Sequence, residues 1–105
     1  MQHQSLGEGR WFELSLAEQL GNIGSEVGRA AKWQFRNENL FWSAVIRALE
    51  LLDLTLRDRR WQKRMPELGR VKEIFADAVL GGEEYRSDFK SLEKYFMQFA
   101  LIARK

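Results

Sequence analysis

The sequence contains no cysteine, and only one histidine and one proline among its 105 residues. Without cysteine, the chain cannot form disulfides, bind zinc or iron–sulfur clusters through thiolates, or use a thiolate nucleophile. The one histidine, His3, lies near the N-terminus, where it is a poor candidate for a catalytic triad or a metal ligand. We therefore expect no catalytic residues, no metal and no cofactor, and hence a protein that is not an enzyme.

Long apolar runs and targeting signals are also lacking. Residues 1–10 are polar and contain no apolar core of a signal peptide. The most apolar stretch, 41–56, is interrupted by Arg47, Glu50 and Asp53, so it cannot cross a bilayer as a bare helix. These features predict a cytoplasmic protein that does not enter a membrane.

The small net charge of +2 is unevenly distributed along the chain. Residues 57–72 carry seven basic and two acidic side chains, whereas 1–56 carry five and seven, and 73–105 carry five and six. The whole positive excess therefore lies in one stretch of sixteen residues. Such a cluster predicts a partner of opposite charge or a solvated surface.

Apolar residues recur at intervals of three and four along most of the chain, as on one face of an α-helix, and no segment alternates with the period of a strand. We expect a first helix over about 16–35 and a second over about 38–58. A third begins at Pro66 and ends at Gly81–Gly82, and a fourth begins after Ser87 and runs almost to the C-terminus. The expected N-caps are Ser15, in a capping box with Glu18, then Asn37, and Ser87, which is followed by Asp88 in the first turn of the fourth helix.

Four amphipathic helices joined by short polar connections bury their apolar faces most simply as an up-down-up-down four-helix bundle. The sequence thus predicts an all-α protein with a single domain over 1–105. Within it, residues 1–13 are expected to form a partly flexible N-terminal arm.

The first expected helix carries a stripe of small residues beside its large apolar ones. Each glycine inside a helix costs about 1 kcal/mol relative to alanine. Close packing of a second helix, within the bundle or across a homo-oligomer interface, would compensate for this cost. A phosphate-binding role is unfavourable, because mid-helix N–H groups are already bonded and the spacing fits no phosphate-binding motif. The stripe consists of Ala17, Gly21, Gly24, Gly28 and Ala31.

Two carboxylates, Glu50 and Asp53, share one helix face, as in all-α magnesium-dependent nucleotide pyrophosphohydrolases. Such an enzyme needs a second acidic pair to hold its metal. The first helix offers only Glu26, with Arg29 where the pair would be completed. A solvated face with salt bridges is therefore the better interpretation. A di-iron site and a HEPN-type RNase pair are excluded because both require histidine within the helices.

The basic stretch is the strongest candidate for a functional site. Arginines around a tryptophan suit phosphate contacts combined with base stacking on RNA or DNA. A protein partner or an oligomer contact, and a solvated loop in which Trp61 covers the end of the bundle, remain open alternatives. The candidate residues are Arg57, Arg59, Arg60, Trp61, Lys63, Arg64, Arg70 and Lys72.

Three segments carry a resemblance to a known family: LSLAEQLGNIGSEV at 14–27, RALELLDLT at 47–55 and SLEKYFMQF at 91–99. Together they resemble a family of small hypothetical helical proteins of bacteria and archaea that has no assigned activity, so the resemblance implies a fold and no site. In size, helix number and basic character the chain is also similar to the accessory variability proteins of diversity-generating retroelements. Those are basic helical bundles that oligomerise and bind nucleic acid beside a reverse transcriptase.

These observations favour a non-catalytic binding or assembly module that associates with itself and can take a further protein partner. The alternative is a nucleic-acid-binding accessory protein of a reverse-transcriptase-type complex, using residues 57–72.

Overall fold

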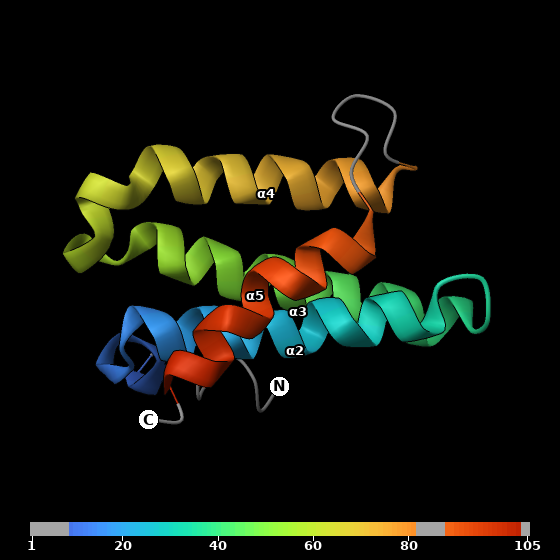
Figure 1. Ribbon diagram of the computed structural model, residues 1–105, viewed down its shortest axis with the longest axis horizontal. Helices are drawn as coiled ribbons and strands as arrows, with labels where there is room; N and C mark the ends of the chain where they lie inside the picture. Colours follow the sequence, from blue (N-terminus) through green and yellow to red (C-terminus); the bar gives the residue numbers. More distant parts are fainter. Residues whose placement is uncertain (1–8, 82–87, 104–105) are drawn as a thin grey trace.

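The computed structural model describes residues 9–81 and 88–103, which form an all-α four-helix bundle (Figure 1). No strand occurs in this part of the chain. The four long helices run alternately in opposite directions, and two short 3-10 helices accompany them. The elements are η1 (Trp11–Glu13), α2 (Leu16–Trp33), α3 (Glu38–Arg57), η2 (Arg59–Arg64), α4 (Met65–Val79) and α5 (Phe89–Ala103).

Local sequence signals set the helix starts. The Ser15 side chain accepts a hydrogen bond from the Glu18 N–H, and the Ser15 N–H donates to the Glu18 carboxylate, so the expected capping box is confirmed. Asn37 caps α3 by accepting from the N–H of Leu40. Asp88 accepts from the N–H of Ser91 at the start of α5, whereas the expected cap, Ser87, lies outside the described residues.

Helix α2 lies at the centre of the packing. It makes its main contacts with α3 and α5, while α4 packs on the other side of α3. In Figure 1, α5 crosses obliquely over α2 and α3. The fully buried core side chains come from all four helices and include Leu20, Ile23, Val27, Leu52, Phe75 and Phe96.

Two connections differ from the expected ones. Helix α2 ends at Trp33, and residues 34–36 form a turn in place of the predicted last helical residues. The segment between α3 and α4 is not a loop, because it folds into η2 and leads directly into α4 at Met65. Hydrogen bonds from Gln19 of α2 to Asp58 and Trp61 hold η2 in place.

The start of the described chain belongs to the bundle. Trp11 is buried, and its indole N–H donates a hydrogen bond of 3.1 Å to the hydroxyl of Thr55 in α3. Residues 1–8 of the expected N-terminal arm lie outside the described residues. No helix in the described ranges is both long and apolar enough to cross a membrane.

Candidate binding surfaces

A buried glutamine organises the end of the bundle where η2 lies. The Gln19 side chain is fully buried, and its amide Nε2 donates to the backbone oxygen of Trp11 at 2.9 Å and to Asp58 Oδ2 at 3.1 Å. Its Oε1 accepts from the indole N–H of Trp61 at 2.9 Å. One side chain of α2 thus joins η1 to η2, and these long-range bonds hold the segment after α3 in place.

Arg60, whose side chain is exposed, joins this hydrogen-bond network from the surface. Its guanidinium donates to both Asp58 oxygens, at 3.0 Å from Nε to Oδ1 and at 2.7 Å from Nη2 to Oδ2, and to the backbone oxygen of Leu14 at 2.7 Å. It also lies 4.4 Å from the centroid of the Trp61 ring. The hydrogen bond from Arg60 lowers the pKa of the Asp58 carboxyl below its usual value, although burial acts in the opposite direction. Arg60 and Trp61, two of the predicted binding residues, are therefore part of the framework of the fold.

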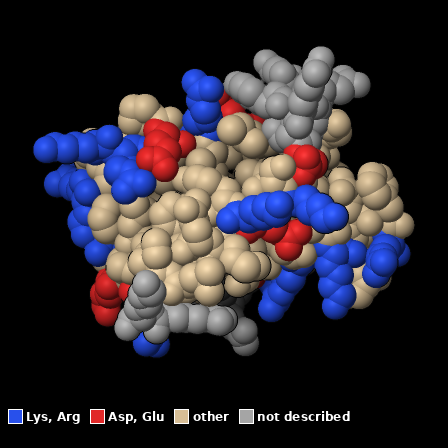
Figure 2. Space-filling model, in the orientation of Figure 1, with Lys and Arg blue, Asp and Glu red and all other residues tan. Residues whose placement is uncertain are grey.

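The other basic residues divide into paired and unpaired groups. Arg64 forms an ion pair of 3.0 Å with Glu67, and Lys72 forms one of 2.6 Å with Asp53. Lys and Arg side chains gather at the η2 end of the molecule (left in Figure 2). Within the described residues, four exposed cations of the stretch form no ion pair: Arg57, Arg59, Lys63 and Arg70.

The acidic residues weighed as a metal site are not gathered into one. Asp53 is engaged by Lys72, and Glu26 lies 3.8 Å from the guanidinium of Arg29. In the ranges that the structure covers, no group of three or more His, Cys, Asp or Glu side chains could hold a metal ion. The described residues thus contain no cluster of metal ligands of the kind that a magnesium-dependent nucleotide hydrolase needs.

The small-residue stripe of α2 lies under α5. A Cβ built on Gly24 would lie 2.5 Å from the Cβ of Phe96, and one on Gly21 would lie 3.1 Å from the Cα of Ala100. A Cβ on Gly28 would meet only the Glu93 carboxylate, at 3.5 Å. Glycine is thus required where the two helix backbones approach most closely. The outer members of the stripe, Ala17 and Ala31, are half-buried.

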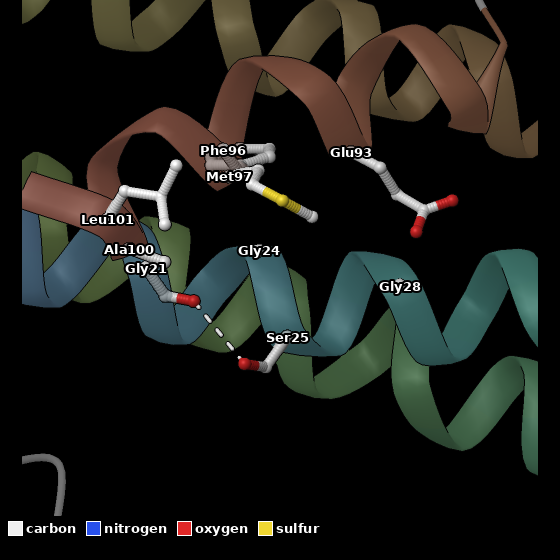
Figure 3. A pocket seen from close by; sticks show the side chains of 9 residues that line it. All are labelled: Gly21, Gly24, Ser25, Gly28, Glu93, Phe96, Met97, Ala100 and Leu101. Atoms are coloured by element: carbon white, nitrogen blue, oxygen red, sulfur yellow. Dashed lines mark hydrogen bonds between the residues drawn. The ribbon is translucent and has the colours of Figure 1, made fainter. Parts of the chain in front are cut away.

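An open groove of about 380 Å³ runs beside this crossing, between α2 and α5 (Figure 3). Glu93 and Met97 extend from α5 over the part of α2 that contains Gly24 and Gly28. Met97 and Leu101, one helical turn apart, are 57% and 56% exposed. The groove lining is Gly21, Gly24, Ser25, Gly28, Glu93, Phe96, Met97, Ala100 and Leu101.

The turn between α2 and α3, at residues 34–36, is not indicated by the sequence pattern. The Arg36 N–H donates to the Trp33 oxygen at 2.9 Å, and Gln34 has φ −56° and ψ 127°, as in a type II turn. The third position of such a turn requires a positive φ and favours glycine, yet Phe35 occupies it with φ 66°. Its side chain is 98% exposed. The helical spacing of apolar residues runs on through Phe35, so no signal in the pattern marks the turn.

No known protein family, curated protein or solved structure matches this chain.

Proposed function

We propose that this protein is a non-catalytic cytoplasmic binding and assembly module that associates with copies of itself through the groove between α2 and α5. The observation that carries the proposal is the pair of apolar side chains on successive turns of α5, Met97 and Leu101, which are both more than half exposed at the edge of the groove. Contiguous apolar surface of this kind is typical of protein interfaces.

The floor of the groove supports the same proposal. Single exposed apolar residues are ordinary on a protein surface. Here, however, the groove also contains Gly28, where an added Cβ would meet only the Glu93 carboxylate, so the backbone of α2 is within reach of an approaching partner at this point. A partner could therefore bury both apolar side chains and contact α2 at the same time.

The test is sedimentation equilibrium on the wild-type protein and on a double variant, Met97→Glu with Leu101→Glu. The proposal expects the wild type to associate and the variant to have the mass of one chain, because two carboxylates would be buried without partners. A matched control, Lys94→Gln with Gln98→Glu, changes the net charge by the same amount at exposed positions of α5. Association of the double variant at wild-type strength would overturn the proposal.

A second candidate function, nucleic-acid binding, is favoured by the four cations without ion pairs in the described residues, Arg57, Arg59, Lys63 and Arg70. Arg59 and Lys63 lie in η2, Arg57 is the last residue of α3, and Arg70 lies in α4. Basic side chains gather at the η2 end in Figure 2. Such a surface suits the phosphate backbone of RNA or DNA, as an accessory protein of a reverse-transcriptase-type complex would require. The indole N–H of Trp61 bonds to Gln19, and the Arg60 guanidinium lies over one face of its ring, so this face is not available for base stacking.

Titration of single-stranded RNA and of duplex DNA at several salt concentrations tests this candidate. The variant Arg59→Gln with Lys63→Gln should weaken binding and make the logarithmic salt slope shallower by about 0.9 for each lost contact with duplex DNA. Lys90→Gln with Lys94→Gln removes the same charge from α5 and should leave binding unchanged. Arg60 is unsuitable as a test position because its replacement would disturb the fold.

A further inference from the structure

Phe35 has a backbone conformation that does not suit phenylalanine, and its side chain adds no stability to the fold. Its φ of 66° lies in the left-handed region, which glycine adopts without steric cost and bulky residues rarely adopt. Its ring is 98% exposed and is not part of the core. Strained backbone and exposed aromatic surface together are typical of a residue that contacts something outside its own chain.

Phe35 is an exposed aromatic knob with a cationic residue on either side of it in the sequence. The turn lies at the tip of the molecule opposite η2 (far right in Figure 1). Lys32 precedes Phe35 by three residues and Arg36 follows it directly, and both are exposed. The Lys32 ammonium lies 5.0 Å from the centroid of the Trp33 ring. Within the described residues, neither of them forms an ion pair. A surface that is complementary to Phe35 and these cations would therefore be an apolar groove with a carboxylate at its edge.

The groove between α2 and α5 has those properties. Its lining is mostly apolar, and its volume of about 380 Å³ is well above the roughly 150 Å³ of an engineered cavity that binds benzene. The Glu93 carboxylate lies in it and has no cation within ion-pair distance among the described residues (Figure 3). Shape and charge thus match the knob at Phe35.

We infer that Phe35 of one copy inserts into the α2–α5 groove of a second copy, with Lys32 or Arg36 beside the Glu93 carboxylate. This inference rests on the proposed self-association and adds which surfaces meet. Because the knob and the groove are different surfaces of the same chain, the contact is heterologous, and each copy carries one of each. Repeated contacts would form a ring or an open chain of molecules.

Two variants with different defects test this arrangement. Phe35→Gly removes the knob, and Met97→Glu with Leu101→Glu blocks the groove. Each alone should weaken self-association by about thirtyfold or more, the effect of losing a dominant interface residue. Mixed in equal amounts, they retain one intact knob and one intact groove, and should form a pair with twice the chain mass of 12.4 kDa and nothing larger.

Weaker association of Phe35→Gly cannot be explained by unfolding, because this change relieves backbone strain and should not lower the thermal midpoint. A third variant, Glu93→Lys, should weaken association, and adding Lys32→Glu with Arg36→Glu to it should restore association. Restoration by these second changes would not occur if Glu93→Lys merely damaged α5.

The possible failures are distinguishable. If the wild type associates and Phe35→Gly associates equally well, the inference is wrong while the proposed self-association stands. If the two variants do not pair when mixed, the contact is not heterologous and the inference is again wrong. A wild-type protein that has the mass of one chain at every concentration would overturn both.

Discussion

The side-chain amide of Gln19 donates a hydrogen bond of 3.1 Å to the carboxylate of Asp58, 39 residues further along the chain, and both side chains are buried. The amide oxygen of Gln19 accepts from the Trp61 indole N–H, and the second amide hydrogen is donated to the Trp11 backbone oxygen. A buried polar group of this kind is tolerated only when its bonds are satisfied. The pair therefore fixes how η2 folds back onto α2.

Replacing Gln19 by leucine should lower the free energy of unfolding by about 2–4 kcal/mol, because the buried Asp58 and the half-buried Trp61 would each lose a hydrogen-bond partner. Urea denaturation measures the change. Asn22→Ala is the control, since the Asn22 side chain is exposed and bonds only to the backbone of its own helix. The role assigned to Gln19 fails if both variants change stability by the same small amount.

Stability should fall in acid partly through Asp58. The hydrogen bond from Arg60 lowers the folded-state pKa of this carboxyl below the ordinary value of 3.8. A depressed folded pKa contributes stability that is present above the unfolded pKa and is lost as the pH falls through the folded one. We expect the free energy of unfolding to decrease below pH 3.8, and Asp58→Asn to be less stable at neutral pH but less sensitive to acid. Urea denaturation at a series of pH values measures both, and an unchanged acid slope in Asp58→Asn would contradict the assignment.

Tyr95 should be detectable by its alkaline titration. Burial, and then the hydrogen bond of 3.0 Å that its hydroxyl donates to Glu67, raise the pKa of Tyr95 to about 12. A raised tyrosine pKa stabilises the fold up to the unfolded value of 10.0, and the contribution is lost as the pH rises to about 12. Ultraviolet absorption should show this step in the wild type and lose it in Tyr95→Phe. In Glu67→Gln the pKa of Tyr95 should fall but stay above 10.0, because burial remains.

Gly24 and Gly28 should respond in opposite ways to alanine. In Gly24→Ala, a Cβ 2.5 Å from the Cβ of Phe96 forces α2 and α5 apart, and we expect a loss of about 1–3 kcal/mol or more. In Gly28→Ala, the new Cβ makes an ordinary contact at 3.5 Å, so the better helix propensity of alanine should add up to about 1 kcal/mol. Thermal or urea denaturation compares the two. Equal effects would mean that α5 does not cross α2 over Gly24.

Glycine in place of Phe35 should stabilise the isolated chain by about 1 kcal/mol, because it adopts a positive φ without a steric penalty. Phe35→Asn should stabilise it less, and Phe35→Ala should change it little. Differential scanning calorimetry at low protein concentration separates this intramolecular effect from association. A lower midpoint for Phe35→Gly would show that the ring supports the fold after all.

The sequence predicts the four helices well because their signals are local. Ser15 and Glu18 are three residues apart, as are Asn37 and Leu40, so caps and starts can be inferred without knowing the fold. The Gln19–Asp58 bond depends on how the helices pack, and nothing near Gln19 in the chain indicates it.

In the candidate site, too, the local features can be predicted from the sequence and the long-range contacts cannot. Composition alone identifies the basic stretch at 57–72, but only the folded chain shows that Arg60 faces Asp58 and that Lys72 pairs with Asp53. The glycine stripe predicts close packing without naming α5 as the neighbour. The spacing predicts a helical Phe35, because an apolar residue at that spacing looks the same in a helix and in a strained turn.

Self-association is the central claim, and sedimentation equilibrium of the wild-type protein from micromolar to millimolar concentration tests it most directly. The account predicts that the weight-average mass rises above the single-chain value of 12.4 kDa as the concentration increases. A mass that stays at 12.4 kDa over the whole range would contradict it.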